Sequence, residues 1–303
     1  MPTARYPNFE GKHGHAAVFS PVEVVAGLVV GGSVVAPDAV VLTYQQSLLD
    51  ELQARGVQPT GGYPAPWRSL WFAGGGGRNI AVAGGFGIGA PGAVIVLEEL
   101  IALGAREFIS IGTAGCLQPR CAFGEAVVCT GAIRDEGASH HYAPAGKFAW
   151  PSEPLTTRLT KALTVGGTAP KTGLAWTIDA PYRETVAEAR SYQAEGVVCV
   201  EMEAAALFSV GRYRGVDVAA AFVISDHLLG QRGDAGGAGR IGHVPHGNLV
   251  GAGDAGQDAP AGRERDVLRG EGRPADWRHR GGQGTQQPGR AALATSHRKI
   301  WSV

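Results

Sequence analysis

The chain lacks an excess of charge of either sign. Among its 303 residues, 27 are Lys or Arg and 27 are Asp or Glu. Proteins that bind nucleic-acid backbones need a basic face, so this balance argues against a nucleic-acid partner. Apolar residues make up 44% of the chain and charged residues only 18%, so a sizeable core is possible. The length is sufficient for one large domain or two small ones.

Long apolar segments are also scarce. The first residues, MPTARYPNFEGKHGH, are polar and lack the apolar stretch of a secretory signal peptide. An apolar run at residues 22–35 carries Glu23 and is shorter than the roughly 20 residues that a membrane-spanning helix needs. We therefore expect a cytoplasmic protein with no membrane partner.

Cysteine is rare, with only 4 in the chain. No two of them form a Cys-x-x-Cys pair, and no histidine stands near them at the spacing of a zinc site. We therefore expect no metal site and interpret all of them as reduced, mostly buried thiols: Cys116, Cys121, Cys129 and Cys199.

What the chain does contain, from about residue 15 to 230, is an alternation of short apolar runs and helical patterns. Helices are predicted at 45–56 and at 91–104, the second with Pro91 in its first turn and Gly104 at its end. Runs rich in Val, Ile and Phe predict strands at 38–44, 79–86, 107–112, 125–133 and 218–226. This alternation predicts an α/β protein, a three-layer α/β/α sandwich around a mixed, twisted central sheet.

The pattern stops at about Gln231. Residues 231–303 are rich in Gly, Arg, Ala, Pro and Asp and show no sustained hydrophobic period. Such a composition buries too little apolar surface to offset the entropy cost of ordering. We therefore expect one domain over residues 1–230, followed by a low-complexity, disordered tail. Reading a GC-rich gene out of frame would also produce this composition.

Two carboxylates interrupt the apolar segment VVCVEMEAAALFSV. Residues 196–200 predict a short buried strand and residues 203–215 a helix, so Glu201 and Glu203 fall at a strand end that runs into a helix start. Free amides and the helix dipole favour an anion there. A carboxylate in that place accepts hydrogen bonds only and suits two adjacent donors, such as the cis-diol of a ribose. The alternative is a helix N-terminus that merely carries acids.

Three motifs together point to a family. They are VEMEAAAL, the strand end VISD about 20 residues later, and the upstream stretch GFGIGAPGAVIVLEELIALGAREFISIGTAGCLQP. In combination they resemble the nucleoside phosphorylases, the family that includes uridine phosphorylase and hexameric purine nucleoside phosphorylase. The resemblance is good over residues 80–230 and weak over 15–79.

The resemblance implies how the sugar is bound. Glu203 matches the acid that grips the ribose 2′- and 3′-hydroxyls, and Met202 matches the residue that packs against the sugar. Glu201 lies beside them as a supporting acid. His13 or His15 matches the histidine that a neighbouring subunit lends to the sugar 5′-hydroxyl; the alternative for either is an isolated surface histidine.

The resemblance also implies phosphate and base contacts. Thr113 and Gly112, in IGTAG, match the segment that holds phosphate through a hydroxyl and backbone groups. The segment TIDAPYRET aligns with the one that covers the base, which brings Tyr182 near the base and makes Arg183 a polar base contact. Asp226 falls where the purine enzymes keep an acid that protonates the leaving base, a general-acid task.

The implied reaction is cleavage of the N-glycosidic bond of a nucleoside by phosphate, which gives free base and ribose 1-phosphate. The chain would then be a pentosyltransferase that needs no cofactor or metal, with phosphate as co-substrate. The implied assembly is a homo-oligomer built from dimers. The base is left open, because the loop RDEGASHHYAP is nearer the uridine enzymes and Asp226 is nearer the purine ones.

Two departures from the family pattern concern phosphate. The family's early Gly-Asp-Pro-x-Arg loop is replaced by LTYQQSLL at residues 42–49, and Ser110 stands where the family has an arginine. A phosphate dianion without arginine partners loses its strongest charge-assisted hydrogen bonds. Two alternatives follow: a nucleoside hydrolase on the same scaffold, and a nucleoside-binding module without catalysis.

Two further patterns have simpler interpretations. The run GFGIGA at residues 85–90 loosely fits a dinucleotide-binding fingerprint, but the next strand ends without the acid that such a site needs. A tight strand-to-helix turn explains it without a ligand. His140 and His141 are adjacent in a loop, so one of them could reach the site, but a structural role is the expected one for such a pair.

Overall fold

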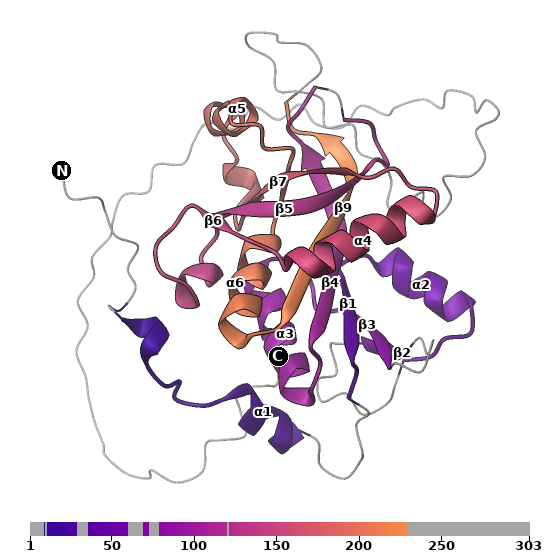
Figure 1. Ribbon diagram of the computed structural model, residues 1–303, viewed down its shortest axis with the longest axis vertical. Coiled ribbons are helices and arrows are strands. Elements are labelled where there is room, and N and C mark those ends of the chain that lie inside the picture. The colour runs from indigo at the N-terminus through magenta and orange to yellow at the C-terminus, as the bar shows by residue number, and fades with distance from the viewer. Residues whose placement is uncertain are drawn as a thin grey trace, which may run out of the picture. The chain divides into compact units, whose positions relative to one another are not determined.

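The computed structural model of the protein describes residues 9, 11–28, 36–59, 69–72, 79–119 and 121–229. These residues form one mixed sheet flanked by α-helices (Figure 1). The strands are β1 (Ala39–Thr43), β2 (Ser69–Phe72), β3 (Ile80–Gly84), β4 (Glu107–Cys116), β5 (Ala126–Asp135), β6 (Phe148–Ala149), β7 (Lys171–Ile178), β8 (Cys199–Glu201) and β9 (Asp217–His227). The α-helices are α1 (Pro21–Leu28), α2 (Gln46–Ala54), α3 (Ala90–Leu103), α4 (Glu153–Val165), α5 (Val186–Ala194) and α6 (Ala204–Arg214). Three short 3-10 helices are η1 (Lys12–Gly14), η2 (Ala138–His141) and η3 (Pro181–Arg183).

The predicted elements are confirmed in type and order. The helix predicted at 91–104 is α3, which has Pro91 in its first turn and Gly104 in the left-handed conformation at its end. The strand predicted at 107–112 is β4, which continues to Cys116. It is longer than predicted because its last residues still pair with β8 and β9.

The sheet is mixed and closes on itself. Its main path is β2-β3-β1-β4-β8-β7-β5-β6, and β9 pairs in parallel with β4 and antiparallel with β5. Because β8 also joins β7 to β4, the strands β4, β9, β5, β7 and β8 form a closed ring of pairings. Glu201 is the last residue of the short strand β8. The ring of pairings therefore places Glu201 beside the ends of β4 and β9.

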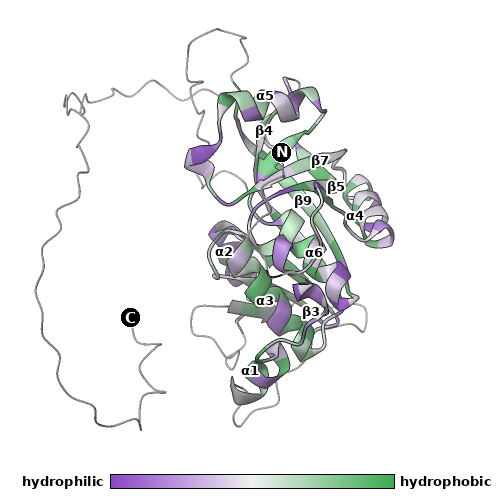
Figure 2. Ribbon diagram, turned by 90° about the vertical axis from the view of Figure 1, so that its left-hand side faces the viewer, coloured by the Kyte–Doolittle hydropathy of each residue, from purple (hydrophilic) through white to green (hydrophobic). Residues whose placement is uncertain are grey.

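Helices cover both faces of the sheet. Val218 and Ala220 of β9 pack in the cluster that contains α3 and α6, whereas Ala219 and Ala221 pack against Leu155 and Leu159 of α4. Successive strand residues point to opposite faces, so α4 and the α3–α6 pair lie on opposite sides. The predicted three-layer α/β/α class is confirmed. Figure 2 shows apolar residues concentrated on α3, α6 and the strands between the layers.

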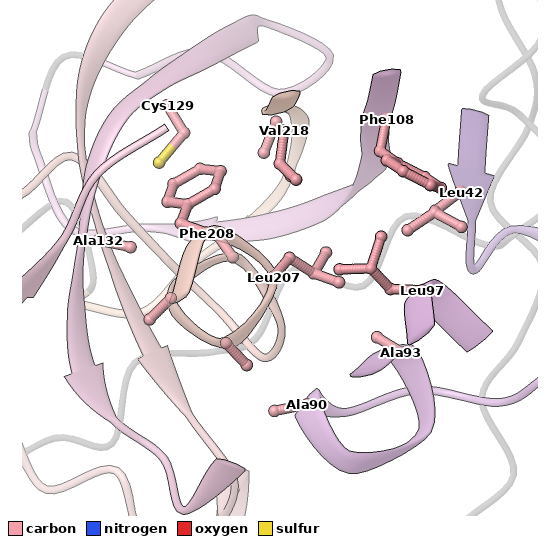
Figure 3. Packing of buried hydrophobic residues seen from close by; sticks show 14 of the residues in the cluster. Leu42, Ala90, Ala93, Leu97, Phe108, Cys129, Ala132, Leu207, Phe208 and Val218 are labelled. Atoms are coloured by element: carbon pink, nitrogen blue, oxygen red, sulfur yellow. The ribbon is translucent and has the colours of Figure 1, made fainter. Parts of the chain in front are cut away.

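The larger part of the core lies between the α3–α6 layer and the sheet. Figure 3 shows Leu97 of α3 and Leu207 of α6 pointing toward each other beneath the strands. Phe208 of α6 lies against Cys129 of β5, and Phe108 of β4 lies beside Leu42 of β1. All of these side chains are almost completely buried. This packing fixes the N-termini of α3 and α6, which both reach the candidate site.

The cysteine prediction is wrong for two of the residues. Cys116 and Cys121 form a disulfide with a Cα–Cα distance of 6.3 Å, while Cys129 and Cys199 are buried free thiols, as expected. The Cys-x-x-Cys rule missed the bond because the partners are 5 residues apart. Cys121 follows β4 through a turn in which its amide donates a hydrogen bond to the carbonyl of Gln118 at 3.4 Å.

Two other predictions, the cytoplasmic location and the disordered tail, are not tested by the described residues. No helix among the described residues is long and apolar enough to cross a membrane, and the cytoplasmic location stays a prediction. The described residues end at residue 229, so the predicted tail at 231–303 lies outside them.

Candidate active site

A cleft of about 850 Å³ opens where the ends of β1, β4, β8 and β9 meet. Six of the residues that the sequence singled out line it together: Thr113, Tyr182, Glu201, Met202, Glu203 and Asp226. They come from four separate stretches of the chain, and the closure of the sheet through β8 is what gathers them.

Glu201 is the most fully bonded of the cleft acids. One carboxylate oxygen accepts hydrogen bonds from the amides of Glu203 and Ala204, both at 2.8 Å. The other accepts one from the hydroxyl of Thr177 on β7. Three protein donors therefore hold this carboxylate, which serves as the side-chain cap of α6.

Glu203 sits at the first position before α6, but its side chain does not cap that helix. Its Oε1 atom instead accepts a hydrogen bond from the amide of Gly89 at 2.5 Å. Gly89 precedes α3 with a φ of 96°, a conformation that favours glycine. The carboxylate thus lies between the N-termini of α3 and α6, where partial positive charge favours an anion.

Burial and mutual repulsion act against these charges. Burial raises the pKa of Glu201 above its ordinary value, and the neighbouring charge of Glu203 adds to the effect. Burial likewise raises the pKa of Glu203, although the Gly89 amide opposes the shift. Two coupled carboxyl groups with raised pKa values in a cleft are typical of functional sites.

The part of the cleft around Thr113 is polar, and its described lining residues carry no positive charge. The Thr113 hydroxyl accepts a hydrogen bond from the side-chain amide of Gln45 at 3.3 Å. The hydroxyls of Tyr44 and Ser110 are hydrogen-bonded at 3.1 Å. Tyr44 and Gln45 line the cleft, and among the described lining residues there is no Lys or Arg. Neutral groups therefore occupy the part of the site where the family pattern has arginines.

Asp226 stands on the cleft wall near the end of β9. It accepts a hydrogen bond from the hydroxyl of Ser225 at 2.7 Å. Glu184 lines the same cleft, and burial, followed by the charges of Asp226 and Glu188, raises its pKa to about 7. His227 also lines the cleft, with its ring edge-on to Phe123 at 5.0 Å between centroids.

Two predicted contacts do not line the cleft. Arg183 borders a separate hollow together with Asp135, Asp179 and Glu188. Gly112 is turned toward Tyr44, whose ring lies 3.1 Å from where a Cβ at this glycine would stand. A side chain at position 112 would therefore press on the Tyr44 ring, which would have to shift by a few tenths of an ångström.

The histidines named from the sequence lie outside the cleft lining within this single chain. His13 is 3.2 Å from the carbonyl oxygen of His140, and the exposed His15 ring packs edge-on to Phe9. His141 is 2.5 Å from the ammonium of Lys12, and a ring nitrogen of His140 is 3.3 Å from the carbonyl of Arg134. The structural role of the pair at 140 and 141 stays a prediction.

Several cleft residues escaped the sequence analysis. Tyr44 and Gln45 entered only as part of the segment that replaces the family's phosphate loop, and Glu184 received no role. Thr177, which does not line the cleft but bonds Glu201, received no role either. A hydrophobic pattern does not identify polar partners that come from distant segments. Among the described residues, no group of three or more His, Cys, Asp or Glu is arranged to hold a metal ion.

A cleft at the strand ends of a mixed α/β fold, lined by acids with raised pKa values, is typical of small-molecule-binding sites. Residues 68–240 match the phosphorylase superfamily, and the chain belongs to that family. This bears out the resemblance that the sequence motifs carried.

The similar proteins include phosphorylases named for purine nucleosides and phosphorylases named for uridine. Guanosine phosphorylase of Halorubrum lacusprofundi is 32% identical over 143 residues, which are 47% of this chain and 59% of that protein. Uridine phosphorylase of Treponema pallidum is 36% identical over 149 residues, covering 46% and 58%. A DeoD-type purine nucleoside phosphorylase of Caldanaerobacter subterraneus is 32% identical over 160 residues, covering 50% and 66%. The chain therefore spans less than two thirds of the length of these relatives.

The fold has a solved counterpart. The crystal structure of uridine phosphorylase from Vibrio fischeri aligns with a TM-score of 0.55 and 27% sequence identity, over 62% of this chain and 78% of that one. The likeness agrees with the three-layer architecture described above.

Proposed function

We propose that this protein cleaves the N-glycosidic bond of a nucleoside, with phosphate as the attacking group. The observation that carries the proposal is the buried Glu203 carboxylate, held by the Gly89 amide and facing the same cleft as Met202 and Asp226. Family membership and the names of the relatives support phosphate as the co-substrate and a pentosyltransferase activity.

In the proposed reaction, the Glu203 carboxylate accepts hydrogen bonds from the 2′- and 3′-hydroxyls, and Met202 packs against the sugar. A phosphate oxygen near Thr113 forms a bond to C1′ while the bond from C1′ to the base nitrogen breaks. The electron pair of that bond passes to the base, and a proton from Asp226 neutralises a purine as it leaves. The acidic lining stabilises the positive charge that develops on the sugar.

Hydrolysis is a second candidate, and one observation favours it. Among the described residues that line the cleft, none is a Lys or Arg, whereas four are acids: Glu184, Glu201, Glu203 and Asp226. A phosphate dianion therefore finds no Lys or Arg donor among these described residues. Water as the attacking group would yield free ribose instead of ribose 1-phosphate.

One assay separates the candidates. Release of free base from guanosine and from uridine is measured with and without inorganic phosphate, and the sugar product is identified by mass spectrometry. Release that depends on phosphate, with ribose 1-phosphate as product, supports the proposal. Release without phosphate, with ribose as product, supports the hydrolase. Binding of either nucleoside without release of base leaves a non-catalytic module.

The proposal extends to the assembly and the domain. A homo-oligomer built from dimers would allow a neighbouring chain to bring its His13 or His15 to the sugar 5′-hydroxyl. Size-exclusion chromatography with light scattering tests this assembly, and a mass equal to one chain contradicts it. Residues 1–230 are proposed as the catalytic domain.

A further inference from the structure

Thr177 occupies a junction between three elements that build the site. It lies near the end of β7 and is completely buried. Its hydroxyl donates a hydrogen bond to Glu201 on β8 and accepts one from the amide of Ala205 on α6 at 3.0 Å. Thr177 does not itself line the cleft, so any influence on a bound ligand passes through other residues.

The contacts continue from Thr177 to the sugar-binding acid. Glu201 receives the Thr177 hydroxyl on one oxygen and the amides of Glu203 and Ala204 on the other. The backbone of Glu203 is thereby fixed at the start of α6. Because Glu201 caps the helix, the Glu203 side chain is available to bond the Gly89 amide and to face the cleft.

We propose that Thr177 is a positioning residue for the reaction: its hydroxyl orients Glu201, and Glu201 holds the backbone from which Glu203 reaches the ribose diol. This inference rests on the proposed function only for the identity of the diol. Removing the hydroxyl leaves a buried carboxylate oxygen without its donor and the Ala205 amide without its acceptor, which disfavours the observed arrangement. The hydrogen bond also favours the ionised form of Glu201, in opposition to burial.

The test compares variants that differ by one hydroxyl. Thr177→Val keeps the shape of the side chain and removes the hydrogen bonds, whereas Thr177→Ser keeps the hydroxyl. Ser209→Ala is the matched control, because it removes another buried hydroxyl bond on α6, the one from Ser209 to the carbonyl of Ala205 at 2.7 Å, without touching Glu201.

The measurement is the ratio of kcat/KM for guanosine to kcat/KM for 2′-deoxyguanosine, with inorganic phosphate present, repeated with uridine and 2′-deoxyuridine. A displaced Glu203 loses discrimination for the 2′-hydroxyl, so we expect the ratio to fall about 10-fold in Thr177→Val. It should recover in Thr177→Ser and stay unchanged in Ser209→Ala. An unchanged ratio in Thr177→Val, or an equal fall in Ser209→Ala, overturns the inference.

A second readout does not depend on activity. Hydrogen exchange of the Glu203 and Ala204 amides reports the bonds to Glu201 directly. We expect exchange to be about 10-fold faster in Thr177→Val and unchanged in Thr177→Ser. If the wild-type chain cleaves no nucleoside, the proposed function fails, and exchange alone decides whether Thr177 fixes this backbone: equal rates overturn it. If Thr177→Val does not fold, Thr177→Ala, which removes the same hydroxyl, replaces it, with the same expected fall in ratio and the same contradicting result.

Discussion

The backbone amide of Gly89 donates a hydrogen bond to the Glu203 carboxylate at 2.5 Å, across 114 residues of sequence. The glycine-rich turn that contains Gly89 therefore supports an acid of the cleft, in addition to connecting β3 to α3. It brings the N-terminus of one helix to the side chain that begins another. The run at residues 85–90, which loosely fits a dinucleotide-binding fingerprint, thus has a structural role, support of Glu203, that requires no dinucleotide.

Replacing Glu203 tests the sugar contact. Glu203→Gln keeps the size of the side chain but turns one acceptor oxygen into a donor that faces the hydroxyl donors of the sugar. We expect kcat/KM for the nucleoside to fall about 10- to 100-fold, as for a loss of ~1–3 kcal/mol. Steady-state assays with guanosine and uridine measure the effect. Glu153→Gln, a change of an exposed acid on α4, should have none, and near-wild-type turnover of Glu203→Gln would remove Glu203 from the site.

The turn glycine offers a separate test with a built-in control. Gly87 and Gly89 both have positive φ, 82° and 96°, so alanine at either position strains the backbone, at a cost of roughly 1–3 kcal/mol in unfolding free energy. Only Gly89 bonds Glu203, and a Cβ at Gly87 meets nothing within 4 Å. We expect a loss of stability in both variants but a lower kcat/KM, compared at matched stability, only in Gly89→Ala. Equal activities at matched stability would show that the Gly89 amide does not support Glu203.

Asp226 carries the prediction about the base. If it protonates a leaving purine, Asp226→Asn should slow cleavage of guanosine by about 10²–10⁴-fold, the usual range for general-acid catalysis. Uridine should be affected much less, because its base offers no equivalent ring nitrogen. Single-turnover rates for the two substrates give the comparison. Equal effects on both would make Asp226 a structural residue, which its hydrogen bond from Ser225 also permits.

Much of this site could be predicted from the sequence, and the reason is local. A strand that ends in Glu-Met-Glu and runs into a helix directs those side chains to the edge of the sheet, whatever the rest of the chain does. The partners that hold them could not be predicted in the same way. Thr177 and Gly89 reach the triplet from 24 and 114 residues away, through strand pairing and helix packing that no local pattern encodes.

The hydrogen-bond partners around Thr113 could not be predicted from the sequence either. The sequence shows that Ser110 and the segment at 42–49 depart from the family pattern. It does not show that Tyr44 bonds Ser110 or that Gln45 bonds Thr113. Those pairs form because β1 and β4 are parallel neighbours in register, with Thr43 opposite Ile111.

The disulfide can be checked by counting thiols. Of the 4 cysteines, two should react with an alkylating reagent in the denatured, unreduced protein, namely Cys129 and Cys199. After reduction, all should react. Closing so short a loop stabilises the fold by about 2 kcal/mol in the chain-entropy account, so reduction should lower Tm. If four thiols are labelled without reductant, the disulfide is absent, and Cys116 and Cys121 are reduced, as expected from their spacing.

The buried acids predict how stability depends on pH. Burial raises the pKa of Glu201 and of Glu203 above the ordinary value of 4.5, and it raises that of Glu184 to about 7. At pH values between the ordinary pKa and the raised pKa, the folded chain keeps protons on these carboxyl groups that the unfolded chain has released. The free energy of unfolding should therefore fall as pH rises from about 4.5 to about 7, by up to about 1.4 kcal/mol per pH unit for each such proton.

Replacing one of these acids by glutamine shows how much that acid contributes to the pH dependence of the free energy of unfolding. Glu201→Gln removes a titrating group but keeps an oxygen that can accept from the amides at the start of α6, so the decline in stability toward neutral pH should become shallower. Urea denaturation at several pH values across this window measures the slope for the wild type, for Glu201→Gln and for Glu153→Gln as the exposed control. The control should retain the wild-type slope. If Glu201→Gln retains it too, then Glu201 is ionised throughout the range, and the three donors around its carboxylate outweigh its burial.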